Sequence, residues 1–517
     1  MLLILLLSLL AHNPVLSEPI PWLEIAYNAS STSITLQLLK NTTSYLTGPD
    51  YLHSWCGNFR YSTQNIHYPQ SVGEVQQIVK NATKVRVLGQ RHSSSRIADS
   101  NDTIISTLAL KQVLAFDPVV PSVIVQGGIT YTDLAPFLQY LGYGLPNLAS
   151  LGEITVAGAI QTGAHGSGRG LQNLANHVRS MQLVLADGRL RTYGPNDPEL
   201  KAAAVGLGAF GVITQVELKL VPTFNVTNYV FLNMPLLQLF EHFDEIQELG
   251  YSVQLFTDFH VPGVWNQVWI NVRSDSNSTV RSMETLFGAT KAKGQVSPVP
   301  LFLSPTFMAD QGKEQPWHYG LVDYHLGLSG TDGTEIETEY FLPYENAVPA
   351  LKALAALSPT FSPLLLYFLV RTAKADDLWM SGSYGEDTVI INLTFLPFMP
   401  GVAVVLPLIE QTLFPFGCRP HWGKVFLMGP EQYLQHYPKI QEFRALVQEV
   451  DPTHKFRNPF LDYNVFSDNT TGTTVNNILT GIIDGTLYNV GTGAVLNNIA
   501  GAIGLVSGNI YGSLFGK

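Results

Sequence analysis

The first half of the chain alternates short apolar strands with amphipathic helices. From Ser71 onward, valine and isoleucine recur every three or four residues behind a Ser71-x-x-Glu74 capping pattern. Short β-branched runs bounded by glycine or polar residues are typical of strands. The pattern predicts helices over 71–80 and 133–141, the second stopped by Gly142, and strands over 84–88, 103–108 and 123–126.

A hairpin and a long strand follow in this first unit. Residues 181–193 predict a hairpin that turns at Asp187 and Gly188. Residues 212–220 alternate apolar with polar side chains, as a half-buried strand does. We expect Pro222 to close the unit.

Beyond Pro222, long apolar strands mix with proline-rich connections. One predicted strand, which ends in ETEYFLP, places Glu335, Glu337 and Glu339 on one face and runs into a helix. The whole pattern predicts an α+β protein with a first domain over 50–222 and a second over 223–465.

The two ends of the chain differ from these domains. Residues 1–17 begin with an apolar run too short to span a bilayer, and Val15 and Ser17 are spaced for signal peptidase, which predicts a cleaved signal peptide. A short buried or anchoring helix is the alternative, because the basic n-region is missing. Residues 466–517 are poor in charge, and we interpret them as a tail outside the core, with a membrane-associating segment and a lipid-anchor signal left open.

Glycosylation sequons are frequent, which favours the secretory pathway and hence the cell exterior or the endoplasmic reticulum lumen. They lie at Asn28, Asn41, Asn81, Asn101, Asn225, Asn277, Asn392 and Asn469. Asn392 falls on a predicted buried strand and is expected to stay unmodified.

Composition limits the function classes. The chain has 517 residues, of which 46% are hydrophobic and 13% charged, so it can bury the cores of two or three domains. Its net charge of -11 argues against nucleic acid as a partner. Cys56 and Cys418 are the only cysteines and leave one disulfide open. Neither CxxC nor HExxH occurs, so the sequence predicts no metal site.

Three glycine-containing segments fall in the first domain. They are VRVLGQRHSSS around Gly89, LASLGEITVAGAIQTGAHGSG from Leu148, and GLGAFGVI from Gly206. Small residues on loops after strands let backbone N–H groups approach a diphosphate. Taken alone, these glycines are a weak signal for a dinucleotide site, and simple glycine turns explain them better.

Taken together and in this order, these segments and RPHWGKVF at 419–426 resemble the vanillyl-alcohol-oxidase or PCMH-type FAD family, in its sugar-1,4-lactone and alditol oxidase branch. The resemblance runs from about Trp55 to Phe460. It implies an α+β fold with a two-subdomain FAD-binding domain and a substrate domain, from which residues 416–465 return to the flavin.

The resemblance implies covalent attachment of FAD to His92, and a neutral imidazole is a competent nucleophile for that bond. A histidine that only hydrogen-bonds within its loop is the alternative. A second, cysteinyl link is not expected, because the matching stretch reads ITVAGA. Arg91 stands where many relatives have glycine. The implied cofactor contacts are Leu88, Gly89, Gln90, Arg91, His92, Ser93, Ser150, Thr155, Val156, Gly158, Thr162, Gly163, Gly166, Gly211 and Ile213.

The implied catalytic residues are Ser150, Glu337, Arg371, Asn392, Thr394 and Lys424. Lys424 matches a lysine that stabilises negative charge on reduced flavin. The family pattern Glu-x-Arg is broken, since Leu369 precedes Arg371 by two residues. We hypothesise that Glu337, on a neighbouring strand, supplies the missing carboxylate, the alternative being a solvated face of three glutamates.

The implied reaction is hydride transfer from a CH–OH carbon to flavin N5, followed by reduction of oxygen to hydrogen peroxide. An aldonolactone of the gulono- or arabinono-1,4-lactone type is the expected substrate, with an alditol as the alternative. Asn392 favours the lactone, and overall similarity favours the alditol. A third interpretation, a flavin-fold carbohydrate-binding protein without turnover, rests on Leu369. Ala149 leaves the electron acceptor open.

Overall fold

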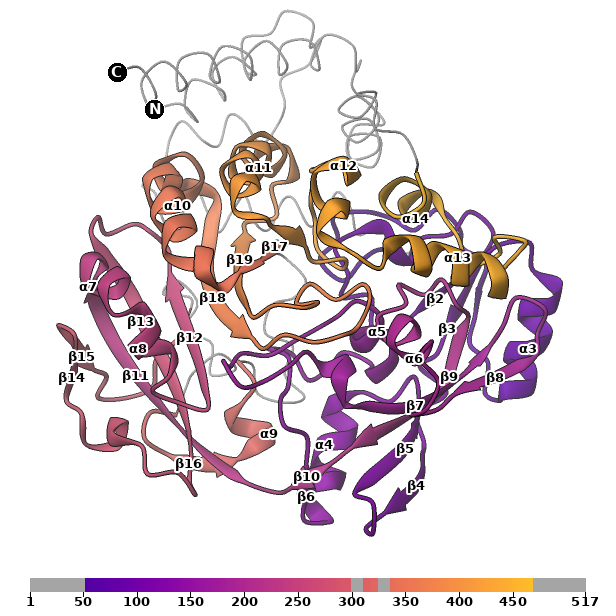
Figure 1. Ribbon diagram of the computed structural model, residues 1–517, viewed down its shortest axis with the longest axis horizontal. Coiled ribbons are helices and arrows are strands. Elements are labelled where there is room, and N and C mark those ends of the chain that lie inside the picture. Colours follow the sequence, from indigo (N-terminus) through magenta and orange to yellow (C-terminus); the bar gives the residue numbers. More distant parts are fainter. Residues whose placement is uncertain (1–51, 299–309, 324–334, 468–517) are drawn as a thin grey trace, which may run out of the picture.

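The structure is a computed structural model and describes residues 52–298, 310–323 and 335–467. The predicted signal peptide and nearly all of the predicted tail lie outside these residues, as do Asn28, Asn41 and Asn469. The protein has an α+β fold with two units side by side (Figure 1).

The first unit contains two principal sheets and several short helices. A small parallel sheet has the order β1-β3-β2, and an antiparallel five-stranded sheet has the order β4-β5-β9-β7-β8. The strands are β1 Ile66–His67, β2 Val85–Leu88, β3 Thr103–Ser106, β4 Val113–Asp117, β5 Ser122–Gln126, β7 Val178–Val184, β8 Leu190–Tyr193 and β9 Val212–Lys219. The helices are α3 Val72–Asn81, α4 Tyr131–Tyr140, α5 Val156–Gln161 and α6 Leu200–Ala203, and β6 Tyr143–Gly144 pairs with β10 Val221–Pro222.

Local sequence signals predicted most of these elements within a few residues. In α3, Ser71 caps the helix by accepting a hydrogen bond from the Glu74 N–H. The Glu74 carboxylate accepts from the Gln70 N–H and from the Ser71 hydroxyl rather than from the Ser71 N–H, so only half of the expected capping box forms. The hairpin at Gly188, where φ is 81°, is confirmed.

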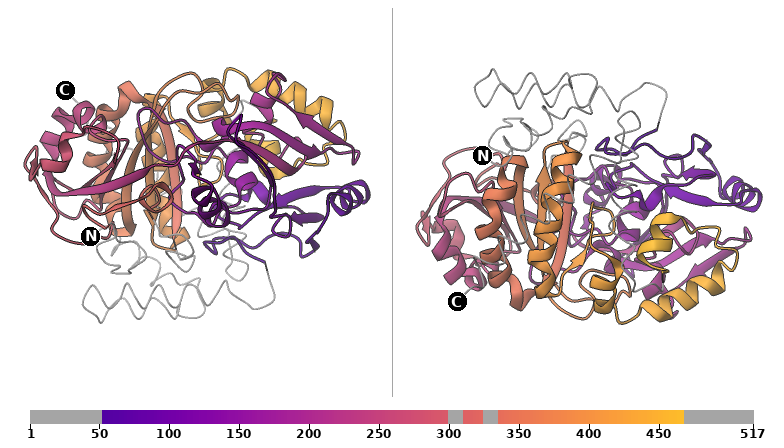
Figure 2. Two further views of the ribbon diagram at one scale, coloured as in Figure 1. Left: turned by 90° about the horizontal axis from the view of Figure 1, so that it is seen from below. Right: turned by 90° about the horizontal axis from the view of Figure 1, so that it is seen from above.

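The second unit is built on a ten-stranded sheet. Its strands are β11 Asn225–Pro235, β12 Ser252–Thr257, β13 Val264–Arg273, β14 Thr285–Leu286, β15 Ala289–Lys291, β16 Glu314–Pro316, β17 Ile336–Pro343, β18 Leu365–Ala373, β19 Thr388–Phe395 and β20 Arg419–Pro420. The long helices α10 Ala347–Phe361 and α11 Met399–Leu413 lie on one face of this sheet (Figure 2). The shorter helices are α7 Leu236–Glu241, α8 Phe243–Gln247 and α9 Trp317–Gly320.

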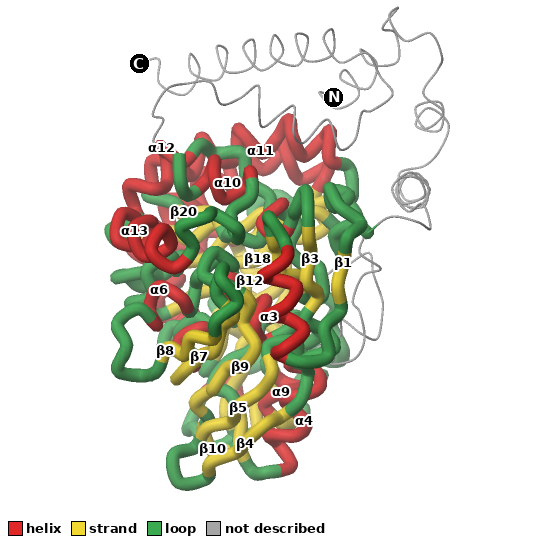
Figure 3. The backbone as a smooth tube through the Cα atoms, turned by 90° about the vertical axis from the view of Figure 1, so that its right-hand side faces the viewer, coloured by secondary structure: helices red, strands yellow, loops and turns green. Residues whose placement is uncertain are grey.

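Helix α11 is apolar because it is a core element. The stretch Met399–Phe416 is the single described helical segment long and apolar enough to cross a membrane, and half of it is buried inside the molecule. Its buried side chains belong to the same core cluster as those of α10 and the sheet. Figure 3 shows α10 and α11 at one end of the molecule, together with the C-terminal helices α12 Pro430–Tyr433 and α13 Ile440–Val450.

The C-terminal segment passes from the second unit to the first. Strand β20 pairs with β17, and α13 and α14 Pro459–Asn464 then lie beside β2 and β3 (Figure 1). The Val85 N–H donates to the Lys455 carbonyl at 2.8 Å, and the Asn458 amide donates to the carbonyls of three residues of the 96–99 turn. The two units are therefore joined both by the 220–225 connection and by this returning segment.

Candidate active site

A single continuous pocket lies where the two units meet. Its walls come from the end of β2 and the loop that follows, from the loop before α5 and the helix itself, and from the 207–213 turn. The second unit supplies strands β17, β18 and β19 and the turn formed by residues 421–424. All three predicted glycine segments thus reach the same pocket.

The loop after β2 carries His92 into this pocket. Arg91 has a left-handed backbone with a φ of 66°, a conformation that favours the glycine found in many relatives. It is held by a hydrogen bond from the Trp55 N–H to the Arg91 carbonyl, at 2.9 Å, and by one from the Arg91 guanidinium to the His53 carbonyl. Trp55 also packs on the His92 ring, with centroids 4.5 Å apart.

Burial keeps the His92 imidazole neutral. Desolvation lowers its pKa to about 3, and the nearby charges of Lys424 and Arg91 act in the same direction. A neutral ring at the pocket wall is the form that a covalent bond to an electrophilic flavin methyl group needs.

Close backbone packing shapes the rest of this wall. Thr155 caps α5 by accepting from the Gly158 N–H at 3.2 Å, and a Cβ on Gly89 would collide with the same hydroxyl. Gly208 and Gly211 have positive φ values of 68° and 146°. These glycines leave a cradle of exposed backbone and small residues that fits an extended dinucleotide such as FAD.

Most predicted cofactor residues line this pocket. They are Leu88, Gly89, Gln90, Arg91, His92, Ser93, Ser150, Thr155, Gly158, Thr162, Gly211 and Ile213. Val156, Gly163 and Gly166 do not line it; Val156 is buried in the core, and Gly166 packs tightly against Asn147.

The register of the sheet sets the floor of the pocket. Glu337 lies opposite Thr394, and Asn392 lies between Glu339 on one neighbouring strand and Leu369 on the other. Because side chains alternate along a strand, these residues project from one face of the sheet. Asn392 and Glu337 line the pocket, whereas Thr394 lies behind Asn392 and donates to its side-chain oxygen at 2.9 Å.

Leu369 occupies a different environment from its polar neighbours. It is fully buried in an apolar cluster with Phe256, Trp269 and Tyr367 and does not line the pocket. The position of the family glutamate has therefore become part of a small hydrophobic core.

Glu337 and Glu339 on β17, and Glu335 just before that strand, all line the pocket. Glu335 and Glu339 are 5% and 4% exposed, and the Glu337 side chain keeps 20% of its surface accessible. The alternative of a solvated glutamate face is therefore wrong. Glu337 forms an ion pair with Lys424, and burial lowers the pKa of Lys424 to about 8.

Arg371 is held by two partners at the pocket wall. Its guanidinium donates to the Ser150 hydroxyl and forms an ion pair with Asp323 at 3.2 Å. The Asp323 N–H in turn donates to the Ser150 carbonyl. No sequence signal pointed to Asp323, because it lies outside every recognised motif.

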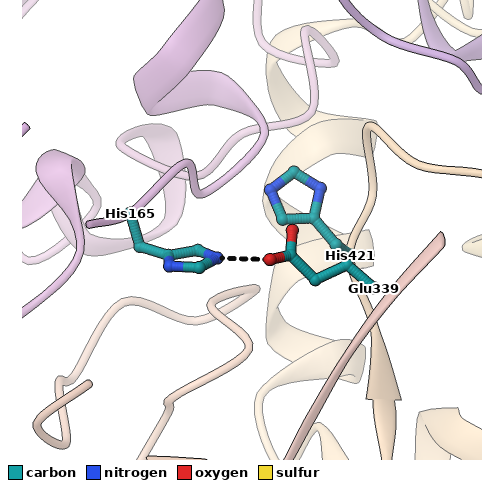
Figure 4. A group of neighbouring side chains, drawn as sticks. All are labelled: His165, Glu339 and His421. Carbon is teal, nitrogen blue, oxygen red and sulfur yellow. Dashed lines mark ion pairs between the residues drawn. The ribbon is translucent and has the colours of Figure 1, made fainter. Parts of the chain in front are cut away.

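A buried cluster of three titratable side chains was also missed. His165, Glu339 and His421 come from segments far apart in the sequence, and their potential ligand atoms all lie within 4.8 Å of one another (Figure 4). His165 and His421 stand in segments that carry the family resemblance, but their spacing fits no metal motif. The two cysteines, Cys56 and Cys418, are buried and free.

Comparisons with known proteins agree with this site. Residues 63–194 match the FAD binding domain family, and residues 333–464 match the family described as D-arabinono-1,4-lactone oxidase. The alditol oxidase of a Streptomyces species is 36% identical over 411 residues, which cover 79% of this chain and 97% of that protein. L-Gulono-1,4-lactone dehydrogenase of Mycobacterium tuberculosis is 27% identical, with the same shares covered.

Solved structures support the fold. Cholesterol oxidase from B. sterolicum superimposes with a TM-score of 0.66 at 16% identity, covering 80% of this chain and 96% of that one. The match to alditol oxidase spans nearly the whole of that relative, and the two family matches fall on the two units described above. The chain belongs to the FAD-dependent oxidoreductases that act on CH–OH groups of sugar derivatives, the family of the alditol oxidases and sugar-lactone oxidases.

Proposed function

We propose that this protein binds FAD covalently through His92 and oxidises a CH–OH carbon of an alditol or an aldonolactone, with oxygen as electron acceptor. The observation that carries the proposal is the single pocket, which joins the glycine-lined cradle and His92 to the floor bearing Arg371, Asn392 and the Lys424–Glu337 pair. Similarity to alditol oxidase favours an alditol. Asn392 favours an aldonolactone.

Bound FAD would accept a hydride from the substrate carbon and pass two electrons to oxygen, which gives hydrogen peroxide. The residues of this chain bind and orient the substrate and handle its hydroxyl proton. Arg371, fixed by Ser150 and Asp323, can donate to substrate hydroxyls without moving. Lys424 supplies a positive charge in the same pocket.

Glu337 is the best-placed proton acceptor among the carboxylates in the pocket. Glu335 and Glu339 are nearly inaccessible, and Glu339 is also paired with His165. Glu337 keeps a fifth of its side-chain surface accessible, and the adjacent Lys424 ammonium favours its ionised form. The pocket therefore retains a base despite Leu369, which weakens the case for a binding protein without turnover.

The covalent link is tested by acid precipitation of the purified protein. We expect yellow colour to remain in the pellet of the wild type and to be lost from His92→Ala. Colour that is released from the wild type by acid contradicts covalent attachment, even where turnover persists.

The role of Glu337 is tested by Glu337→Gln. We expect kcat to fall by about 10²-fold or more, since general-base catalysis contributes on that scale. The matched control is Glu345→Gln, which changes an exposed glutamate just beyond the same strand and should leave kcat unchanged. Unchanged turnover and pH profile in Glu337→Gln would show that the base lies elsewhere.

We also propose that the chain enters the secretory pathway. Four sequon asparagines within the described residues, Asn81, Asn101, Asn225 and Asn277, are exposed, whereas Asn392 is buried. Enzymatic removal of N-glycans should therefore lower the mass of protein expressed in a eukaryotic host, with Asn392 unmodified. A mass that equals that of the bare full-length chain contradicts this localisation.

A further inference from the structure

We propose that His165, Glu339 and His421 form a charge-paired positioning unit, in which His165 is an imidazolium, and that this unit fixes the 421–424 turn and thereby Lys424. The part concerning Lys424 rests on the function proposed above. All three residues are buried, at 4%, 4% and 6% exposure, and their side chains face one another across the two units (Figure 4).

The hydrogen bonds of His165 define its protonation. Its Nδ1 lies 2.8 Å from the Gly166 carbonyl oxygen, which can only accept, so Nδ1 carries a hydrogen. Its Nε2 lies 3.3 Å from a Glu339 carboxylate oxygen. Interaction with His165 and the permanent charge of Arg371 hold the pKa of Glu339 at about 2 against the effect of burial, so this carboxylate is ionised and also only accepts. Both ring nitrogens therefore donate.

His421 has the opposite arrangement. Its Nδ1 accepts a hydrogen bond from the Gly423 N–H at 3.0 Å, so this nitrogen is unprotonated. Burial lowers the pKa of His421 to about 4, which leaves a neutral ring with its hydrogen on Nε2. The cluster thus holds one cation, one anion and one neutral ring.

The hydrogen bonds of the two histidines favour the charge-paired unit over a metal centre. Two histidines and a glutamate at this separation have the composition of a metal site. A histidine that binds a metal through Nε2 normally donates its other N–H to an acceptor, which His421 does not do. The positive charge of Arg371 also acts on Glu339 and His421.

Main-chain bonds connect the unit to Lys424. Glu339 and Glu337 are two residues apart on β17, and their carbonyls accept from the N–H groups of His421 and Val425, both at 2.9 Å. The Lys424 N–H donates to the His421 carbonyl, which closes the turn. The turn also reaches the flavin side, because the Ser94 N–H donates to the Gly423 carbonyl at 2.7 Å.

Apolar packing makes the unit sensitive to the loss of one partner. Phe341 lies edge-on to His165, with centroids 5.0 Å apart, and stacks with His421. In such a dry environment, removal of one charge leaves the other unpaired, whereas removal of both is tolerated better.

The protonation of His165 can be tested directly by solid-state ¹⁵N NMR of the flavin-loaded protein with labelled histidine. At a pH where exposed histidines are neutral, we expect one imidazolium signal in the wild type, lost in both His165→Gln and Glu339→Gln. His318→Gln, which removes a buried histidine on α9, is the control and should retain it. Absence of the signal from the wild type, or its survival in His165→Gln, overturns the assignment.

The positioning role is tested by a double-mutant cycle. We expect His165→Gln and Glu339→Gln each to lower kcat by about tenfold to a hundredfold with little change in KM. The double variant should have a kcat no lower than that of the slower single variant. Sulfite affinity, read from loss of the oxidised-flavin absorbance, should fall in parallel, because it depends on positive charge near the flavin and needs no substrate. Additive losses, or sulfite affinity unchanged in every variant, contradict the positioning role.

Metal analysis of the purified protein tests the alternative that the three side chains form a metal site. Stoichiometric metal that is present in the wild type and absent from Glu339→Gln overturns the proposal of a charge-paired unit. Because NMR, sulfite and metal readouts need no turnover, failure of the proposed function and failure of this inference are distinguishable.

Discussion

Arg91, next to the proposed flavin-linked histidine, combines a bulky side chain with a left-handed backbone. Such a conformation costs a residue with a Cβ roughly 1–2 kcal/mol, and most of all a β-branched one. The hydrogen bonds from Trp55 and to His53 hold it in place. Strain of this kind next to a reactive side chain fixes the direction in which His92 projects.

We predict that Arg91→Gly changes the free energy of unfolding by less than about 1 kcal/mol, because relieved strain offsets the lost guanidinium contact and the entropy of glycine. Arg91→Val should cost at least about 1 kcal/mol more than Arg91→Gly. Both variants lose the same side-chain bond, so their difference in chemical denaturation isolates the backbone. Equal stabilities of the two variants contradict this account of the loop.

We expect the reaction to depend on pH through Lys424. Its pKa lies near 8 instead of its ordinary 10.5, because burial disfavours the ammonium. The positive charge is present below this pKa and is lost as pH rises through it. We predict that substrate-dependent flavin bleaching in stopped flow slows above about pH 8, and that Lys424→Arg, which stays charged, abolishes this fall. An identical alkaline limb in both proteins refutes the assignment to Lys424.

At the scale of elements, helix α11 supports the segment that carries Lys424 through a buried carboxyl. Glu410 accepts hydrogen bonds at 2.7 Å from the Tyr340 hydroxyl on β17 and from the Leu427 N–H, three residues after Lys424. Burial raises the pKa of Glu410 to about 7. The protonated form therefore fits the folded protein better than the ionised one.

The pKa of Glu410 is higher in the folded protein than its unfolded value of 4.5. The contribution of protonated Glu410 to the free energy of unfolding is therefore full below pH 4.5 and is lost as the pH rises through about 7. Glu410→Gln keeps an oxygen for both donors and cannot ionise. We predict that it is nearly neutral at about pH 5 and stabilises the protein by on the order of 2 kcal/mol at about pH 8. Denaturant titrations at the two pH values check this, and an equal effect at both contradicts it.

Elements whose signals are local could be predicted from the sequence. Helix α3 followed from apolar spacing and the Ser71 cap, and the β7–β8 hairpin from Asp187 and Gly188. The environment of Leu369 could not be predicted from the sequence, because β12 lies beside β18 and places Phe256 against Leu369. Which of the three glutamates meets Lys424 likewise depends on how the segment after β20 lies along β17, where the Val425 N–H donates to the Glu337 carbonyl.

At the scale of the whole molecule, the site exists only where distant segments meet. His165, Glu339 and His421 are separated by 174 and 82 residues (339 minus 165, and 421 minus 339), so no local motif could reveal them. The family resemblance placed His92, Arg371 and Lys424 correctly in one pocket. It did not indicate Asp323, whose contact with Arg371 comes from a connection between strands.

Arg86 joins the returning C-terminal segment to the first unit. Its guanidinium donates to the carbonyls of Ile97, Leu207, Gly208 and Phe456, and burial lowers its pKa to about 10. These acceptors belong to three separate loops, and the side chain also lines the pocket. The buried Arg86 side chain thus links the C-terminal segment to the 207–208 turn of the proposed cofactor site.

We predict that Arg86→Met destabilises the protein by at least about 3 kcal/mol, because several buried carbonyls lose their donor. The flavin-to-protein ratio should fall as well, since the 207–208 turn loosens. Arg189→Met, at an arginine that is 80% exposed, is the control and should change neither quantity. Full flavin content together with wild-type stability in Arg86→Met would falsify this coupling.

Anaerobic mixing of the purified holoprotein with alditols and aldonolactones tests most directly the proposal that this pocket oxidises a sugar-derived alcohol. We predict that at least one of these compounds bleaches the oxidised-flavin absorbance, and that Glu337→Gln slows this bleaching by about 10²-fold or more. The contradicting result is flavin that a chemical reductant bleaches normally but that no alditol or aldonolactone reduces.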